Sequence, residues 1–172
     1  MIMANYNLSV TGHRPDKLWG YDYSNPHYVA LTSRFEEIVK DILKSYSSVT
    51  MYSGMALGVD TAFAFTALKL KKLGFPVKLV CVVPFQGQES QWPQHSQDIY
   101  HYLLSVADNI VYTASPGYES WKMQHRNKYL VNVCDKLVAV WDGSSGGTAN
   151  CVNYANSKNC DIIRINPQDL RV

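Results

Sequence analysis

Residues 49–83 read VTMYSGMALGVDTAFAFTALKLKKLGFPVKLVCVV. The runs from Val49 to Ser53 and from Val77 to Val83 are short and rich in β-branched residues, which is typical of buried strands. Between them, the alanine-rich segment from Val59 to Leu73 has the length of a helix. A strand, a glycine-containing turn, a helix and a second strand form a βαβ unit, whose two strands are parallel. This stretch therefore predicts an α/β fold.

The same alternation continues on both sides of this unit. Further strands are predicted at Tyr6 to Thr11, Asn109 to Tyr112, Lys136 to Trp141 and Asp161 to Ile165. Further helices are predicted at Tyr28 to Ser45, Gln94 to Val106, Ser120 to Val133 and Thr148 to Ser157. An apolar face that packs on the sheet is predicted for the first of these helices from Leu31, Phe35, Ile38, Ile42 and Leu43. The predicted fold class is α/β, a single Rossmann-like domain with a mostly parallel central sheet flanked by helices on both faces.

Length and composition fit one domain spanning residues 1–172, with 47% hydrophobic residues to build a core. Sixteen basic and fourteen acidic side chains give a net charge of +2, too small to attract nucleic acid or an anionic membrane over a distance. No apolar run approaches the roughly 20 residues that span a bilayer, and the start MIMANYNLSV does not resemble a secretory leader. We therefore expect a cytoplasmic protein with neither a membrane nor a nucleic-acid partner.

Several sequence signatures of catalysis and cofactor binding are absent. The four cysteines form no CxxC pair and are interpreted as reduced, structural thiols. The five histidines show no HxxxH or HExxH spacing, so we expect no metal site. The chain also has no Walker A motif, no GxGxxG and no GxSxG, which argues against ATP hydrolysis, NAD binding and a serine hydrolase. We expect no cofactor.

The carboxyl ends of the strands are where open α/β sheets bind ligands, so the residues that follow each strand are the site candidates. After the first strand come Gly12, His13 and Arg14. Glycine permits a tight turn, and the Arg14 guanidinium can bind a phosphate or carboxylate through two hydrogen bonds. The alternative is an ordinary turn with an exposed arginine.

The second strand leads into SGMALGVD at residues 53–60, which contains two glycines four residues apart just before a helix. Such a turn can direct backbone N–H groups at an anion near the helix N-terminus. The candidates here are Ser53, Gly54, Met55, Gly58 and Asp60. Asp60 either caps its helix, which we favour, or acts in catalysis.

The loop after the third strand supplies Pro84, Phe85, Gln88 and Trp92. Aromatic and amide side chains of this kind can stack on a base and hydrogen-bond its edge. They can equally pack within the loop itself, and the sequence does not separate the two interpretations.

The fourth predicted helix combines Met123, Arg126, Asn127 and Leu130 just before the next strand. Arg126 and Asn127 are site candidates because they can reach the ligand side of the sheet. The alternative for Arg126 is a surface salt bridge, which contributes little to stability.

A second glycine-rich loop, WDGSSGGTAN, occupies residues 141–150 and opens the last helix. Thr148 is placed to cap this helix, and the N–H groups of the loop are available to oxyanions. Its candidates are Asp142, Gly146, Gly147, Thr148 and Asn150. This loop is the strongest single signal of a binding site in the chain.

Taken together, five segments resemble the SLOG superfamily, and most closely its YpsA/YspA-like branch. They are TGHRP, SGMALGVD, VPFQGQESQW, MQHRN and AVWDGSSGGTAN. The resemblance covers nearly the whole chain and implies a Rossmann-like fold. The superfamily also contains the Smf/DprA proteins, whose SGxAxGxD turn is similar to residues 53–60, and the LOG phosphoribohydrolases. Because LOG-like domains commonly pair, the resemblance also implies a homo-oligomer, a dimer or larger.

The LOG enzymes cleave the N-glycosidic bond of nucleoside monophosphates with a helix arginine and a glutamate after a PGGxGTxxE loop. The segment around Arg126 resembles the arginine segment, but Asn150 or Cys151 stands where the glutamate belongs. Without that carboxylate, the group expected to act in hydrolysis is missing. The resemblance therefore implies binding without turnover.

The leading hypothesis is a sensor or sequestering protein for a nucleotide, an ADP-ribose-like molecule or a cyclic nucleotide second messenger. Its phosphates would lie against Gly54 to Gly58 and Gly146 to Thr148, with Arg14 and Arg126 supplying charge. Residues Phe85, Trp92 or Trp19 would stack on the base, and Asn150 and Asn153 would bind ribose hydroxyls. Two alternatives stay open. One is an N-glycosidase in which Asp142, Glu89 or Glu119 replaces the missing glutamate, and the other is a DprA-like module that binds single-stranded DNA.

Overall fold

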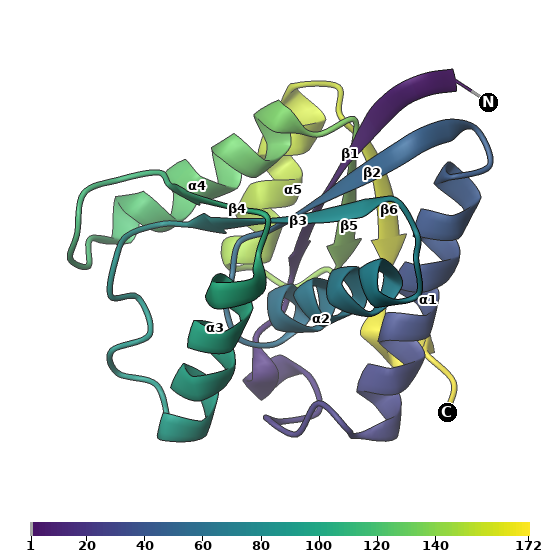
Figure 1. Ribbon diagram of the computed structural model, residues 1–172. Coiled ribbons are helices and arrows are strands. Elements are labelled where there is room, and N and C mark those ends of the chain that lie inside the picture. Colours follow the sequence, from purple (N-terminus) through teal and green to yellow (C-terminus); the bar gives the residue numbers. More distant parts are fainter. Residues whose placement is uncertain (1) are drawn as a thin grey trace.

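The structure, a computed structural model, describes residues 2–172 as a parallel sheet with helices on both faces (Figure 1). The strands are β1 (Ile2–Gly12), β2 (Tyr46–Ser53), β3 (Val77–Val83), β4 (Asn109–Tyr112), β5 (Lys136–Val140) and β6 (Asp161–Ile165). The helices are α1 (Pro26–Ile42), α2 (Val59–Lys72), α3 (Gln94–Val106), α4 (Ser120–Val133) and α5 (Gly147–Ser157). Two short 3-10 helices are η1 (Pro15–Lys17) and η2 (Pro167–Asp169). The predicted α/β fold class is confirmed.

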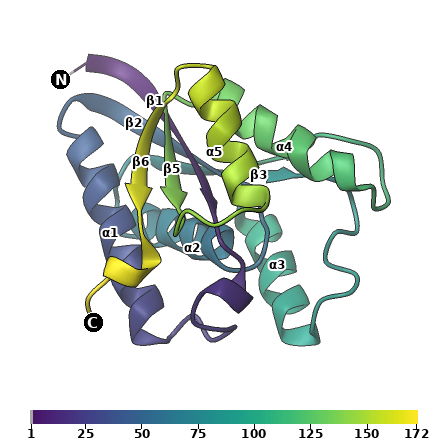
Figure 2. The same ribbon diagram turned by 180° about the vertical axis from the view of Figure 1, so that it is seen from behind.

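The strand order is β4-β3-β2-β1-β5-β6, and each neighbouring pair is parallel. The chain builds the sheet outward from β1 to β4 and then returns to the other side of β1 for β5 and β6. Helices α1, α2 and α3, which connect β1 to β4, cover one face of the sheet, and α4 and α5 cover the other (Figures 1 and 2). The winding therefore reverses between β1 and β5, which is the switch point where ligands bind in such sheets.

The core lies mainly between the sheet and the first three helices. Leu8 and Val10 of β1 are fully buried, and Phe35 of α1 meets Phe63 of α2 edge to face with ring centroids 5.1 Å apart. The predicted apolar face of α1 is confirmed because Leu31, Phe35 and Ile38 are buried in this core. This packing fixes α2, and with it the turn that precedes α2, against the end of β1. Between residues 2 and 172, no helix is long and apolar enough to cross a membrane.

Element boundaries differ from the prediction mainly at the start of the chain. Strand β1 begins at Ile2, before the predicted start at Tyr6, because Ile2 and Asn5 pair with Tyr46 and Ser48 of β2. Helix α1 begins at Pro26 because the Asn25 side chain accepts a hydrogen bond from the His27 N–H at 2.9 Å. It ends at Ile42, and the predicted end at Ser45 is wrong because residues 43–45 form the turn into β2.

Candidate functional site

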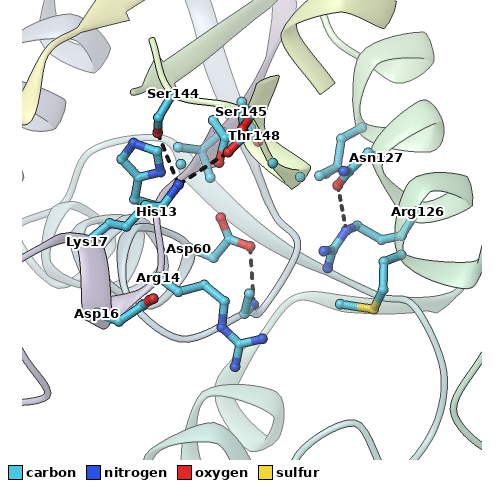
Figure 3. A pocket seen from close by; sticks show the side chains of 18 residues that line it. His13, Arg14, Asp16, Lys17, Asp60, Arg126, Asn127, Ser144, Ser145 and Thr148 are labelled. Atoms are coloured by element: carbon cyan, nitrogen blue, oxygen red, sulfur yellow. Dashed lines mark hydrogen bonds between the residues drawn. The ribbon is translucent and has the colours of Figure 1, made fainter. Parts of the chain in front are cut away.

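A pocket of about 360 Å³ opens at the carboxyl ends of β1 and β5, at the switch point of the sheet (Figure 3). Its volume lies at the small end of the range typical of ligand sites, roughly 300–1,000 Å³. Four segments far apart in the sequence form its wall: the end of β1 with η1, the turn before α2, one face of α4, and the loop between β5 and α5. The lining residues are Val10, Thr11, Gly12, His13, Arg14, Asp16, Lys17, Ala56, Asp60, Met123, Arg126, Asn127, Leu130, Ser144, Ser145, Gly146, Gly147 and Thr148.

The end of β1 is positioned by close packing against α2. A Cβ atom at Gly12 would lie 2.6 Å from the side chain of Val59, so only glycine lets the strand approach the helix this closely. Immediately beyond, η1 places Lys17 across the pocket from the β5–α5 loop. The Lys17 Nζ donates to Ser144 Oγ at 3.0 Å and to the Ser145 carbonyl at 3.2 Å. Lys17 was not among the predicted site residues and lies three residues beyond Arg14, the last candidate after β1.

Four backbone N–H groups of the turn at residues 53–60 already donate hydrogen bonds within the protein. These hydrogen bonds run from Met55 N to Ser53 Oγ (3.2 Å), Ala56 N to Asp60 Oδ2 (3.1 Å), Gly58 N to Tyr23 OH (2.9 Å) and Val59 N to His13 O (3.3 Å). These four N–H groups are therefore not free to bind a phosphate. The placement of phosphates against Gly54 to Gly58 stays a prediction, from which these four bonded amides are removed.

The two glycines of this turn allow close packing. At Gly58, φ is 92° and a Cβ atom would lie 2.6 Å from the carbonyl oxygen of His13. At Gly54, a Cβ atom would lie 2.6 Å from Nη1 of Arg126 and 2.9 Å from Oδ2 of Asp60. The glycine spacing that suggested an anion site thus serves to bring the turn against β1 and α4.

Arg126 and Asp60 are buried charged residues that both line the pocket. Arg126 is 5% exposed, donates from Nη1 to the Gly54 carbonyl and from Nε to Asn127 Oδ1 at 3.0 Å. The alternative of a surface salt bridge is therefore wrong. Asp60 is 6% exposed, and its burial raises the pKa of its carboxyl group, against the opposing effect of the Arg126 guanidinium. The favoured interpretation of Asp60 as a helix cap is also wrong, because Gly58 occupies the cap position and Asp60 lies inside the first turn of α2.

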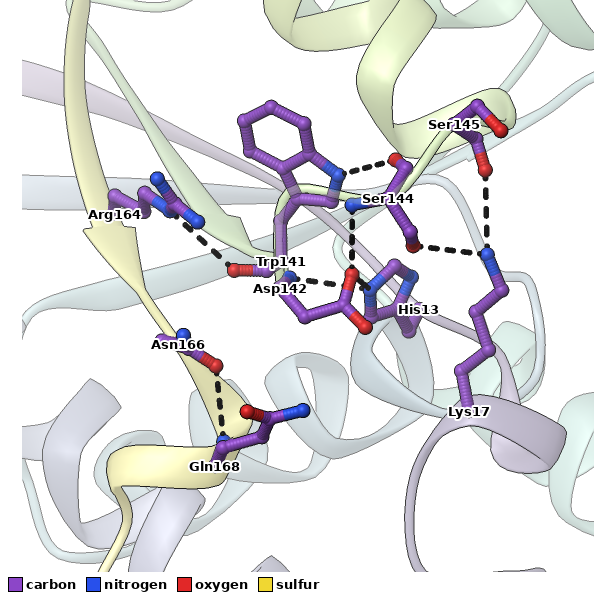
Figure 4. A network of polar contacts seen from close by, with 9 residues as sticks. All are labelled: His13, Lys17, Trp141, Asp142, Ser144, Ser145, Arg164, Asn166 and Gln168. Atoms are coloured by element: carbon purple, nitrogen blue, oxygen red, sulfur yellow. Dashed lines mark hydrogen bonds and ion pairs between the residues drawn. The ribbon is translucent and has the colours of Figure 1, made fainter.

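The loop after β5 is held in shape by a polar network (Figure 4). His13 Nε2 lies 2.8 Å from Asp142 Oδ1, and the same oxygen accepts the Ser144 N–H at 2.9 Å. The Trp141 indole donates to the Ser144 carbonyl at 2.8 Å. Hydrogen bonds from Ser144 and from His13 hold the pKa of Asp142 well below its usual range. Asp142 therefore acts as an ionised anchor that ties the loop to the end of β1.

This loop delivers the N-terminus of α5 to the pocket. Gly146 precedes the helix with φ at 139°, a conformation that favours glycine, and α5 begins at Gly147. Thr148 lies within the first turn, so the prediction that Thr148 caps the helix is wrong. The first amide groups of a helix have no acceptor within the helix, and they carry the positive end of its dipole. Gly147 and Thr148 therefore offer an anion-binding helix end inside the pocket.

The loop after β3 lies outside the pocket lining. Phe85 is 5% exposed and meets Tyr118 edge to face at 6.0 Å, and Trp92 packs on Tyr100 at 5.3 Å. Gln88 Nε2 donates to the Met55 carbonyl at 3.1 Å, which braces the turn from behind. Pro84 is buried beside these residues, at the end of β3. Their contacts fit the alternative of a packed loop.

Other residues named from sequence also lie away from the pocket lining. Trp19 stacks on His27 at 5.4 Å, and Asn150 and Asn153 are exposed on α5. Glu89 contacts His101 at 3.2 Å, and Glu119 accepts from the Trp121 indole at 2.7 Å. Among the residues that the structure describes, the carboxylates that line the pocket are instead Asp16 and Asp60.

Helix α4 contributes one complete face to the pocket. Met123, Arg126, Asn127 and Leu130 all line it, and their steps of three and four residues place them on one side of a helix. This spacing is the signal that would have added Met123 and Leu130 to the candidates. Over residues 2–172, no three His, Cys, Asp or Glu side chains form a group that could hold a metal ion.

The chain matches a protein-family model over nearly its full length. The sequence model of the YspA SLOG family matches residues 8–170. The chain belongs to this family. It is 32% identical over 142 residues to the SPbeta prophage-derived protein YoqJ of Bacillus subtilis strain 168, a match covering 76% of this chain and 83% of that protein. It is also 28% identical over 171 residues to a UPF0398 protein of Brevibacillus brevis, covering 95% and 90% of the two chains.

Structure comparison finds the same fold in two DNA processing proteins. DprA of Streptococcus pneumoniae matches with a TM-score of 0.65 at 16% identity, covering 94% of this chain and 50% of DprA. DprA of Helicobacter pylori, solved to describe its single-stranded DNA binding mode, matches with a TM-score of 0.61 at 16% identity, covering 92% and 64%. The chain thus spans about half to two thirds of these proteins. At this identity the similarity shows a shared fold.

Proposed function

We propose that this SLOG protein binds a nucleotide-derived small molecule in the pocket between β1 and β5, as a sensor or a sequestering protein. The observation that carries the proposal is the N-terminus of α5, which opens into a pocket at the switch point of the sheet, with Lys17 held at the same loop by contacts of 3.0 and 3.2 Å. A helix N-terminus and an adjacent lysine are a suitable combination for a phosphate. The phosphate would lie against Gly146 to Thr148.

The charged residues of the pocket favour a ligand with its negative charge at one end. The lining contains three basic residues, Arg14, Lys17 and Arg126, and two acidic residues, Asp16 and Asp60. A phosphate would be drawn to the end where Lys17 and α5 meet and repelled from Asp60. Met123 of α4 is a partly exposed apolar side chain in the pocket lining, which can contact the face of a base. Met123 replaces Phe85 and Trp92 as the proposed contact for the base.

The experiment is native mass spectrometry of the protein as purified from cells, followed by identification of any small molecule released on denaturation. We expect a phosphate-bearing nucleotide derivative, retained by the wild type and lost by Lys17→Ala. Lys44→Ala is the matched control, because Lys44 is exposed and pairs with Asp41 at 3.4 Å on the surface. The same spectra report the oligomeric state, which we propose to be a dimer or larger. We also propose a cytoplasmic location.

If the purified wild type releases no small molecule, its binding is tested by thermal shift with nucleoside monophosphates, cyclic nucleotides and ADP-ribose. No shift with any of them at millimolar concentration would contradict the proposal. A nucleotide held equally by the wild type and Lys17→Ala would contradict the placement of the phosphate. Release of free base from any of these nucleotides would show turnover. Glu89, Glu119 and Asp142, named as replacements for the missing glutamate, do not line the pocket.

Single-stranded DNA binding is the second candidate, and the fold shared with DprA favours it. The sequence-based expectation of no nucleic-acid partner therefore needs a direct test. A gel shift with single-stranded DNA at 50 and 200 mM salt separates the two candidates, because phosphate contacts weaken steeply with salt. Binding at 50 mM salt that is lost at 200 mM salt would support this candidate, and no binding at 50 mM salt would remove it.

A further inference from the structure

Asp60 is the buried carboxylate in the centre of the proposed pocket. It is 6% exposed and belongs to the first turn of α2, where the packing of α2 on β1 fixes its backbone. One oxygen, Oδ2, accepts the Ala56 N–H at 3.1 Å. Figure 3 shows the other oxygen turned towards the space below Ser145 and Thr148, with Arg14 on the opposite side. The turn therefore holds one acceptor atom of Asp60 facing the pocket.

A buried carboxylate of this kind requires hydrogen-bond donors. Burial raises the pKa of Asp60, which reflects how poorly the ionised form is solvated at this position. A phosphate placed against Asp60 would add a like charge, whereas a hydroxyl group would donate to the acceptor oxygen without adding charge. The ligand should therefore carry its anionic group at α5 and its hydroxyl donors at Asp60.

We propose that Asp60 binds a hydroxyl group of the ligand's ribose ring and so selects ribonucleotides over nucleotides that lack ribose hydroxyls. This inference rests on the proposed function, because it assumes a nucleotide with its phosphate at Gly146 to Thr148. It also assigns to Asp60 the binding of ribose hydroxyls, which was expected of Asn150 and Asn153; both asparagines are exposed on α5. In this arrangement Asp60 is a specificity-determining residue that contacts the ligand.

The test measures dissociation constants of AMP, GMP, CMP and UMP and of their 2′,3′-dideoxy counterparts by isothermal titration calorimetry. For the best-bound nucleotide, we expect the dideoxy form to bind the wild type at least about tenfold more weakly, as the loss of a hydrogen bond to a charged group predicts. The 2′-deoxy and 3′-deoxy forms identify which hydroxyl is bound. In Asp60→Asn, which keeps an oxygen for the Ala56 N–H, the ratio should fall to within about threefold.

Lys17→Ala is the matched control, since it should weaken the ribonucleotide and its dideoxy form by the same factor and leave their ratio unchanged. Equal binding of both forms by the wild type would overturn the assignment of Asp60. A ratio preserved in folded Asp60→Asn would overturn it as well, and if this variant fails to fold, the wild-type ratio decides alone. No binding of any of the four monophosphates, of cyclic nucleotides or of ADP-ribose by the wild type would instead overturn the proposed function.

Discussion

At the residue scale, Gly58 shows what a glycine in this site does. Its φ of 92° favours glycine, and its missing Cβ leaves room for the carbonyl oxygen of His13, which would lie 2.6 Å away. Gly74, beyond the end of α2, has nearly the same φ of 90°, but a Cβ atom added there would meet no neighbouring heavy atom of residues 2–172 within 4 Å. The two positions therefore separate the cost of the backbone conformation from the cost of the close approach.

We expect Gly74→Ala to lower the free energy of unfolding by about 1 kcal/mol, which is the cost of an unfavourable backbone conformation. Gly58→Ala should lower it by a further 1–3 kcal/mol or so, because the added methyl group overpacks the contact with His13. Urea unfolding followed by circular dichroism measures both values. Equal effects of the two substitutions would show that the turn and β1 are less tightly packed than this contact requires.

The sequence predicted that Gly54 and Gly58 lie at the ligand side of the sheet, but it did not predict that both allow close packing. A glycine required for close packing cannot be told in the sequence from a glycine required for anion binding, because both occur in turns before helices. The difference depends on which amide groups are already bonded. Gly58 and Val59 donate to Tyr23 and His13, which are remote in sequence, so no local pattern reports these bonds.

At the element scale, Lys122 fixes the start of α4. Its side chain is 1% exposed, and its Nζ donates to the carbonyl oxygens of Ser115 at 2.9 Å, Pro116 at 3.4 Å and Gly117 at 2.9 Å. The loop between β4 and α4 is therefore wrapped around one ammonium group. Because α4 carries Arg126 into the pocket, this contact connects a loop outside the site to the geometry within it.

We expect Lys122→Met to lower the free energy of unfolding by about 2 kcal/mol, because several hydrogen bonds to a charged group are lost. Hydrogen exchange should accelerate in residues 113–119, and nucleotide binding should weaken as Arg126 becomes less well placed. Lys128→Met is the matched control on the same helix, since Lys128 is exposed and lies over the Tyr154 ring at 5.5 Å. A change of stability confined to less than about 0.5 kcal/mol in both variants would contradict the role of Lys122.

The helices and strands themselves were predictable because their apolar periodicity is strong, as in α1 and β3. The loop after β3 was not, because Phe85 and Trp92 have the same residue types whether they stack on a base or pack against Tyr118 and Tyr100. Lys17 was missed for a related reason, since a lysine in a polar loop has no sequence signal until its partner Ser144 is known. Tertiary contacts, more than local propensity, decide these positions.

At the scale of the whole molecule, one core connects most of the elements. It joins Leu8 of β1, Phe35 of α1, Phe63 of α2, Leu103 of α3 and Ile165 of β6. Smaller clusters on the opposite face, such as Val131 with Cys151, pack α4 and α5 onto the same sheet. The pocket draws residues from α2 on one face of the sheet and from α4 and α5 on the other, so its geometry depends on both helix layers being packed on β1 and β5.

This arrangement predicts that residues 1–172 unfold as one domain in a single cooperative transition. Trp19 packs near α1 and Trp92 packs on α3, so their fluorescence reports on separate regions of the chain. Two variants each keep one tryptophan, Trp19 or Trp92, with the other three replaced by Phe. In urea, the fluorescence and the circular dichroism of each variant should give one midpoint. An earlier transition seen by fluorescence alone in the variant that keeps Trp92 would mean that the edge formed by α3 and β4 melts separately. The loop after β3, whose Gln88 braces the turn of Asp60, would then be free to open while the β1 and β5 walls of the pocket remain folded.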